Sequence, residues 1–228
     1  MNQLISSLDK DIAPDIKKLH DPQFSGIDRT MFQNQIHELS NRLERINNAM
    51  KSIHEPCKHI PAIQIVGTNG KGSIASFLGS ILKEASIKTG ITTSPHLIYW
   101  NERIRINNQT ISKDLFDQKV KSLERIKQES NLSTFEFITL IALDYFNSQE
   151  VELLVLEAGL GGRLDATTAH NLRPIIAIAS IGLDHCEYLG NSLQAIAYEK
   201  GSVITENSHV ISCSQHPEVI KIFKKISQ

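Results

Sequence analysis

The stretch that decides the fold is Ala62-Ile-Gln-Ile-Val-Gly-Thr-Asn-Gly-Lys-Gly-Ser73. Its first five residues form a short, mostly β-branched apolar run before a glycine, which predicts a buried strand over 62–66 that feeds a turn. The turn is rich in glycine and contains a lysine, and a helix is expected from residue 72. This order is typical of a loop that cradles phosphate, because clustered backbone N–H groups and a helix N-terminus attract an anion.

The glycine loop predicts a nucleotide site. Lys71 supplies a charge that can reach the β- and γ-phosphate oxygens, and the Ser73 hydroxyl can bind phosphate or Mg²⁺. The match to the general pattern GxxxxGK[ST] is imperfect, because Ile65 and Gly72 stand where a glycine and a Ser/Thr belong. A glycine-rich strand-to-helix turn without a ligand is the alternative. The candidate nucleotide-binding residues are Thr68, Asn69, Gly70, Lys71, Gly72 and Ser73.

Strands and helices alternate on the C-terminal side of this loop. Strands are predicted over 62–66, 87–92, 151–157, 174–181 and 208–213, and helices over 72–86, 112–128, 134–148, 191–200 and 216–226. Apolar strands between helices indicate a sheet covered on both faces, hence a mostly parallel, doubly wound α/β domain over residues 61–228. Residues 1–60 are predicted to form a helical segment packed on that core, with an amphipathic helix over 29–53.

Composition limits the class of protein. The 228 residues contain 24 Lys+Arg and 25 Asp+Glu, for a net charge of −1. This balance argues against a nucleic-acid or membrane-surface binder. No apolar run reaches the roughly 18 residues of a membrane span, and the first residues lack a signal-peptide core. The three cysteines are far apart and form no CxxC pair, so a reducing cytoplasm is the expected location.

Three polar residues follow predicted strands and are candidates for a metal site. Glu157 ends an apolar strand, where an unpaired carboxylate would be costly to bury, so a divalent cation on ATP phosphates is its expected partner. Ser94, in a Ser-Pro turn, can present a hydroxyl to an ion, although a plain surface turn is the alternative. His185 lies beside Asp184 at another strand end, and a lone histidine of this kind is more often structural than catalytic.

Several motifs, in the same order, resemble the folylpolyglutamate synthase/dihydrofolate synthase family of the Mur ligase group. They are GTNGKGS at 67–73, SPHL and ERIRIN between 94 and 107, LEAGLGGRLDAT at 156–167, IGLDH at 181–185 and IAYEKG at 196–201. The resemblance covers nearly all of residues 40–215 and implies the central, P-loop ATPase domain of these enzymes. It also implies ATP and two Mg²⁺ ions as cofactors.

The same resemblance implies roles for individual residues. Ser94, Glu157 and His185 would ligate one Mg²⁺ ion, and a carbamylated Lys200 would support the second. The candidate catalytic residues are Lys71, His185 and Lys200. The TxFE-like segment that begins at Thr134 would line a pterin pocket, although core packing of Phe135 explains the segment equally well. The candidate substrate-binding residues are Thr134, Phe135, Glu136, Arg163, Leu164, Asp165 and Ala166.

The implied activity is that of an ATP-dependent ligase, which joins the carboxylate of dihydropteroate or a folate to L-glutamate through an acyl phosphate. Small molecules are the expected partners, without nucleic acid or membrane, and a monomer is expected. Another Mur-type ligase and a nucleotide- or pterin-binding module without turnover remain as alternatives. Nothing in residues 204–228 resembles the family's C-terminal domain, so we expect that domain to be absent and turnover by this chain to be impaired.

Overall fold

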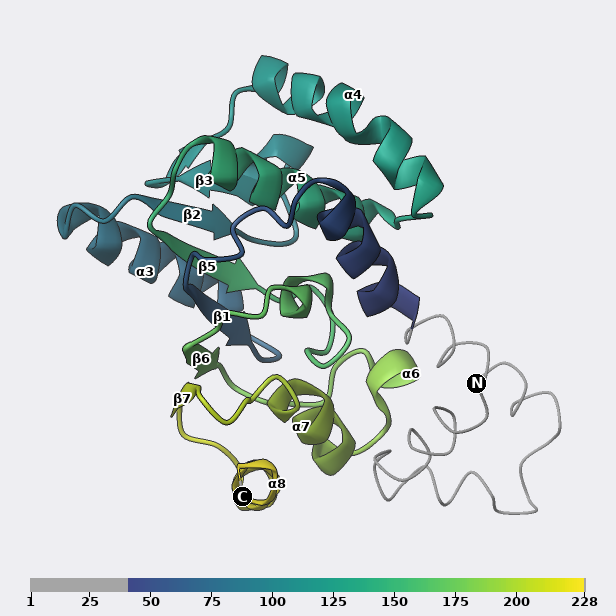
Figure 1. Ribbon diagram of the computed structural model, residues 1–228. Helices are drawn as coiled ribbons and strands as arrows, with labels where there is room; N and C mark the ends of the chain where they lie inside the picture. Colours follow the sequence, from purple (N-terminus) through teal and green to yellow (C-terminus); the bar gives the residue numbers. More distant parts are fainter. Residues whose placement is uncertain (1–40, 228) are drawn as a thin grey trace, which may run out of the picture.

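A seven-stranded sheet organises residues 41–227, the part of the chain that the computed structural model describes (Figure 1). Its strand order is β4-β3-β2-β5-β1-β6-β7. The strands are β1 (Ala62–Val66), β2 (Thr89–Thr92), β3 (Ile104–Ile106), β4 (Gln109–Thr110), β5 (Leu153–Glu157), β6 (Ile175–Ile178) and β7 (His209–Ser212). The five strands from β2 to β7 in this order run parallel, which confirms the predicted mostly parallel α/β sheet.

Helices connect the strands at the predicted places. The α-helices are α3 (Lys71–Glu84), α4 (Lys113–Glu129), α5 (Thr134–Ser148), α6 (Cys186–Leu189), α7 (Leu193–Gly201) and α8 (Pro217–Ile226), and the 3₁₀ helices are η2 (Trp100–Arg103) and η3 (Ala166–Ala169). Residues 41–52 are also helical, which agrees with the described part of the helix expected over 29–53. The remainder of the predicted N-terminal segment lies outside the described residues.

One edge of the sheet was not predicted. β3 pairs with β2 in the antiparallel direction and β4 pairs with β3, so residues 104–110 form a small hairpin. Asn107 and Asn108 make its turn with φ values of 49° and 64°. Asparagine tolerates this left-handed region better than most residues, because its short polar side chain can bond locally.

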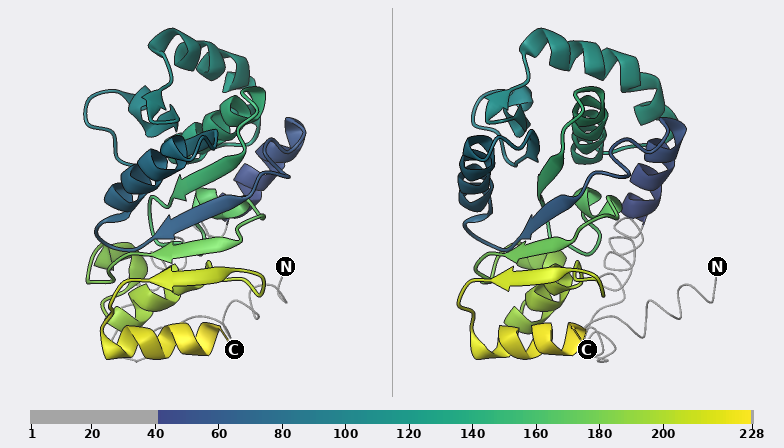
Figure 2. Two further views of the ribbon diagram at one scale, coloured as in Figure 1. Left: turned by 90° about the vertical axis from the view of Figure 1, so that its left-hand side faces the viewer. Right: turned by 60° about the vertical axis from the view of Figure 1, so that its left-hand side comes forward.

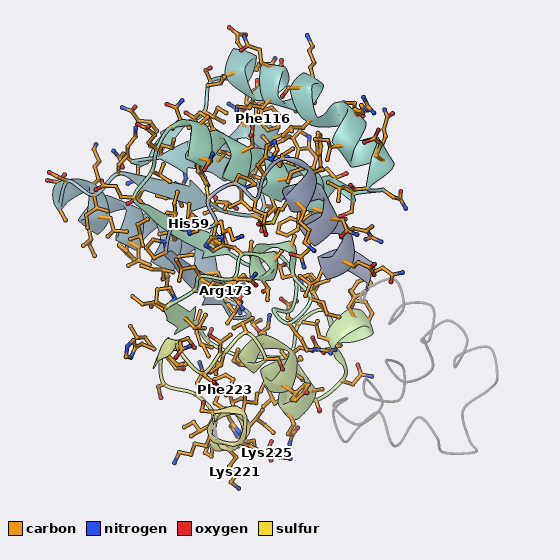
Figure 3. All side chains as sticks on the ribbon, viewed as in Figure 1. His59, Phe116, Arg173, Lys221, Phe223 and Lys225 are labelled. Carbon is orange, nitrogen blue, oxygen red and sulfur yellow. The ribbon has the colours of Figure 1, made fainter. Side chains whose placement is uncertain are left out.

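The two faces of the sheet are covered by different helices (Figure 2). Side chains alternate along β5, so Val155 packs in the cluster beneath α3 while Leu154 and Leu156 pack with α5 and the 41–52 helix. β6 and the C-terminal helices form a third cluster, in which Phe223 of α8 is buried. Figure 3 shows Phe223 pointing toward α7, whereas Lys221 and Lys225 point away from the body of the molecule.

Local sequence explains where α5 begins. The Ser133 hydroxyl accepts a hydrogen bond from the Glu136 backbone, and the Glu136 carboxylate accepts one from the Ser133 backbone. This reciprocal capping satisfies two backbone donors that a helix start otherwise leaves unpaired. None of the helices in the described residues is both long and apolar enough to cross a membrane.

Candidate nucleotide and metal site

The glycine loop forms an open helix N-terminus. Gly70 is the N-cap of α3 with φ 90°, and no side chain caps the helix there. Gly67, with φ 144°, lies so close to β6 that a Cβ would be 2.6 Å from the Cβ of Ala179. The first N–H groups of a helix have no partner within the helix, so those of α3 are available to an anion, as predicted for a phosphate loop.

Two lysines converge on this loop. The Lys71 ammonium donates hydrogen bonds to the carbonyl oxygens of Gly67 (3.0 Å) and Thr68 (3.2 Å). The Lys200 ammonium donates to the same Gly67 oxygen at 2.9 Å. Lys200 is only 4% exposed. Burial lowers the pKa of Lys200 to about 8, and repulsion from Lys71 acts in the same direction. The structure therefore brings two of the three predicted catalytic residues together.

Glu157 lies at the end of β5 beside the start of α3. The residue is 3% exposed, and its carboxylate accepts a hydrogen bond from the Ser94 backbone N–H at 3.0 Å. A Cβ placed on Gly72 would be 3.8 Å from both carboxylate oxygens, so no side chain of that residue separates the helix N-terminus from Glu157. Burial raises the pKa of Glu157, while the Ser94 hydrogen bond and the charge of Lys71 oppose that rise.

This arrangement fits a divalent cation at Glu157. A buried carboxylate with a single hydrogen bond among the described residues gains from a cationic partner, and Mg²⁺ prefers oxygen ligands. Ser94 does lie at Glu157, as predicted, but the contact in the structure is made by its backbone N–H. Within residues 41–227 no group of three or more His, Cys, Asp or Glu side chains is arranged to hold a metal ion.

His185 lies on a neighbouring loop. It is the N-cap of α6 with φ 49°, and its half-exposed ring is 3.7 Å from a carboxylate oxygen of Asp184. The loop is tied to the phosphate loop, because the Thr68 hydroxyl donates to the Gly182 carbonyl and accepts from the Gly182 N–H, both at 3.1 Å. His185 as a metal ligand stays a prediction.

The glycine-rich segment after β5 is held by Asp165. This buried carboxylate accepts hydrogen bonds from the backbone of Gly159 (2.9 Å), Leu160 (3.0 Å) and Thr167 (3.0 Å) and from the Thr167 hydroxyl (2.6 Å). Arg163 pairs with Glu199 at 2.8 Å, next to Lys200. Leu164 is half-buried, and Ala166 is buried at the start of η3. The predicted substrate residues of this segment thus shape the loop beside Lys200.

The start of α5 meets the same segment. The Phe135 ring packs against Gly159, where an added Cβ would be 2.7 Å from a ring carbon. Thr134 is exposed at the first turn of the helix. Both oxygens of the Glu136 carboxylate are engaged, one by Arg45 at 2.9 Å and the other by Arg45 and the Ser133 backbone. Phe135 therefore lies beside the glycine-rich segment and Thr134 on the exposed first turn of α5, and their role in substrate binding stays a prediction, while Glu136 joins two helices.

Three residues near the site were not among the predicted site residues. Gln64 is fully buried in β1, where it donates to the hydroxyls of Thr167 and Thr168 and accepts a hydrogen bond from Arg173. Burial lowers the pKa of Arg173 to about 10, and Figure 3 shows it near the middle of the molecule. A polar Gln64 within an apolar strand was the signal for this network. The third residue is Arg105 of β3, inside the ERIRIN segment.

Comparison with known proteins places these features in a family. Residues 65–227 match the Mur ligase middle domain. A curated relative, the probable dihydrofolate synthetase of Schizosaccharomyces pombe, is 39% identical over 168 residues, which are 72% of this chain and 40% of the relative. The chain thus spans about two fifths of the length of that protein.

Solved structures resemble the chain as well. Mycobacterium tuberculosis folylpolyglutamate synthase, complexed with ADP and AMPPCP, matches with a TM-score of 0.76 and 34% identity, over 81% of this chain and 44% of that one. The bifunctional folylpolyglutamate synthase/dihydrofolate synthase from Yersinia pestis, complexed with AMPPNP and Mn ion, matches with a TM-score of 0.73 and 31% identity, over 81% of this chain and 45% of that one.

Proposed function

Because this chain belongs to the Mur ligase family, we propose that it acts in ATP-dependent amide formation between a folate or dihydropteroate carboxylate and L-glutamate. The observation that carries this proposal is the meeting of Lys71, Lys200 and Glu157 around the uncapped start of α3. The folate synthases among the relatives support the choice of substrate.

The proposed reaction begins with phosphoryl transfer. A substrate carboxylate oxygen attacks the γ-phosphorus of ATP, the bond from that phosphorus to the ADP oxygen breaks, and an acyl phosphate forms. The glutamate amine then attacks the acyl carbon and displaces inorganic phosphate. Phosphoryl transfer depends mainly on positioning and on electrostatic stabilisation of the moving charge. In this chain the N–H groups at the start of α3 bind the phosphates, and Lys71 exchanges its two carbonyl partners for phosphate oxygens.

Glu157 and Ser94 would hold Mg²⁺ beside those phosphates, with His185 as the third proposed ligand. The ion, when bound, neutralises part of the charge on the phosphate oxygens. Glu157 is suited to this role because its carboxylate is buried beside the helix N-terminus and has spare acceptor capacity.

Carbamylation of Lys200 is also proposed. A pKa near 8 leaves a substantial fraction of neutral amine near neutral pH, and only the neutral amine adds to CO₂. The ammonium first loses one proton; the neutral nitrogen then bonds to the carbon of CO₂ and releases a second proton, so the cation becomes an anionic carbamate. The resulting carbamate would support the second Mg²⁺ ion.

The folate site is proposed at the junction of α5 with the glycine-rich segment. Phe135 offers an aromatic face for a flat pterin ring, and Thr134 is exposed beside it. Gly159, against which Phe135 packs, belongs to the loop that Asp165 holds in place. Arg163, Leu164 and Ala166 lie on the same loop, and Glu136 would act there through the position of α5. We further propose that the protein is a cytoplasmic monomer.

The proposal is tested with the full chain, Mg-ATP, L-glutamate and either dihydropteroate or a folate, by measurement of ADP release. We expect folate-dependent ADP release, at the low rate of an impaired ligase, that Glu157→Gln abolishes and that Glu206→Gln, which changes an exposed carboxylate outside the site, leaves unchanged. Binding of Mg-ATP without folate-dependent ADP release would contradict the ligase proposal and favour a binding module. ADP release with a different carboxylate acceptor alone would favour another Mur-type ligase.

A further inference from the structure

Arg105 lies on the same face of the sheet as the candidate metal ligand. In the sheet, Arg105 of β3 stands opposite Ile91 of β2, and Ile91 stands beside Val155 of β5. Paired residues of neighbouring strands share a face, and Ile91 and Val155 both lie in the cluster beneath α3. Glu157 follows Val155 by two residues, so it shares that face at the carboxyl end. Arg105 therefore flanks α3 on the side that carries Glu157.

Arg105 is half-buried, and its guanidinium makes no hydrogen bond and no ion pair within 4 Å among residues 41–227. Its Nε atom is buried and makes no hydrogen bond there. Burial lowers the pKa of Arg105, and the negative charge of Glu157 works against that effect. A buried, charged donor without a partner is costly. The cost is removed when a ligand brings an acceptor to this position.

Arg103, two residues earlier, provides an internal comparison. Its Nε donates to the Nδ1 atom of His96 at 2.9 Å, and its guanidinium lies 4.8 Å from the centroid of the Trp100 ring. Arg103 is thus held within the loop of residues 96–103. Arg105 has neither such a hydrogen bond nor such a ring contact, although the negative charge of Glu157 acts on the pKa of both arginines.

The balance of charge indicates the kind of ligand. Lys71 and Arg105 face the lightly bonded carboxylate of Glu157, and the N-terminus of α3 adds further positive potential. The nearby carboxylate of Asp165 is already occupied by four hydrogen bonds within its own segment, and Lys200 is balanced by Asp184, Asp165 and Glu199. The missing partner is therefore an anion with several oxygens. A guanidinium presents a planar fork of N–H donors that matches phosphoryl oxygens in a bidentate manner.

Resting on the nucleotide site of the proposed function, we propose that Arg105 binds the terminal phosphoryl group of the bound triphosphate. A nucleoside diphosphate lacks that group, so Arg105 discriminates between the triphosphate and the diphosphate. The residue is a phosphate-binding residue for the reaction, supplied by a strand that contains none of the predicted site residues.

The test compares nucleotide affinities by calorimetry, in the presence of Mg²⁺, with a non-hydrolysable ATP analogue and with ADP. In the full chain, Arg105→Gln should weaken binding of the triphosphate analogue about ten- to a hundredfold and change the affinity for ADP by less than about twofold. Arg105→Lys, which keeps the charge but not the fork, should give an intermediate loss. The matched control is Arg125→Gln, since Arg125 is exposed on α4 and pairs only with Glu129 among the described residues. This control should leave both affinities unchanged.

The outcomes separate this inference from the function on which it rests. If the native chain binds neither nucleotide, the nucleotide site itself is wrong. If the native chain binds both and the Arg105 variants lose affinity for neither, or for both equally, the role of Arg105 is overturned. Loss of dihydropteroate binding alone would assign Arg105 to the substrate carboxylate and also overturn it. Should Arg105→Gln fail to fold, unchanged triphosphate affinity in Arg105→Lys overturns the inference.

Discussion

At the scale of single residues, Lys200 determines how the free protein responds to pH. In the folded chain its pKa is about 8, against 10.5 for an ordinary lysine. Below pH 8 both the folded and unfolded forms carry the charge, so the folded form bears the full cost of burying it. Between pH 8 and 10.5 the unfolded form binds more protons, and the free energy of unfolding therefore rises with pH.

The buried thiol of Cys57 limits the pH range in which the effect of Lys200 on the free energy of unfolding can be measured. Burial raises the pKa of this thiol from 9.0 to about 12, so above pH 9 the unfolded chain loses that proton first, and this loss of stability offsets the rise that Lys200 causes. Between pH 8 and 9 we expect the free energy of unfolding to rise, with a slope of up to about 1.4 kcal/mol per pH unit. Urea unfolding at several pH values measures the slope, and Lys200→Met should flatten it. An equal slope in the variant would show that Lys200 is not its source.

The positions of site residues were predictable only where one local motif contains them. Lys71 and Glu157 were placed from their positions beside a glycine loop and at a strand end. The structure adds that Glu136 bonds to Arg45, 91 positions away along the chain. No local pattern predicts that pairing. The Ser133-x-x-Glu136 capping signal was present in the sequence, and it explains why this carboxylate turns toward the start of its own helix.

At the scale of elements, the sequence predicts a helix or strand well where the element is long and where capping residues mark its ends. The predicted bounds of α5, 134–148, match the structure because Ser133 supplies a strong N-cap. The β3–β4 hairpin was missed because its strands have three and two residues, too few to show an alternating pattern. The predicted strand over 174–181 ends at Ile178, since Ala179 and Ser180 bond to Val66 and Thr68 around the phosphate loop.

Packing of β2 against α5 gives a test at this scale. Gly90 lies so close to Phe146 that an added Cβ would be 2.6 Å from the ring. Phe146 is fully buried and has little room to move. Gly90→Ala should therefore lower the free energy of unfolding by about 1–3 kcal/mol, as overpacking does.

The control for this test is Gly182→Ala, where a Cβ would meet nothing within 4 Å. This substitution should change the free energy of unfolding by less than about 1 kcal/mol, since the added methyl group enters open space. In a double-mutant cycle, Gly90→Ala combined with Phe146→Leu should be less destabilising than the sum of the two single changes. Strict additivity in urea unfolding would mean that the ring does not cause the strain.

At the scale of the whole molecule, one ion pair joins the first described helix to the core. Arg45, on the 41–52 helix, pairs with Glu136 of α5 at 2.9 Å, with side-chain exposures of 20% and 2%. Ile46, Ala49 and Met50 of the same helix lie in the cluster that α5 helps to form. The helix is therefore part of the cooperative unit and does not stand apart from the sheet.

Arg45→Met should destabilise the whole unit by about 2–3 kcal/mol, because it leaves the buried Glu136 without its cationic partner. The matched control is Arg125→Met, whose pair with Glu129 is 87% and 57% exposed and should contribute less than about 1 kcal/mol. Circular dichroism and tryptophan fluorescence, followed through the same urea titration, should give coincident curves. Separate transitions, or equal effects of the two variants, would contradict this role.

The order of strands in the sheet also determines when the phosphate loop can form during synthesis of the chain. β1 has no neighbour among the strands that immediately follow it, since its two partners are β5 and β6. The β2–β3–β4 hairpin segment can pair locally at once, whereas β1 must wait until residues 153–157 have left the ribosome. Closing so long a loop is slow. The glycine loop at the end of β1 therefore cannot reach its final position until β5 and β6 have been synthesised.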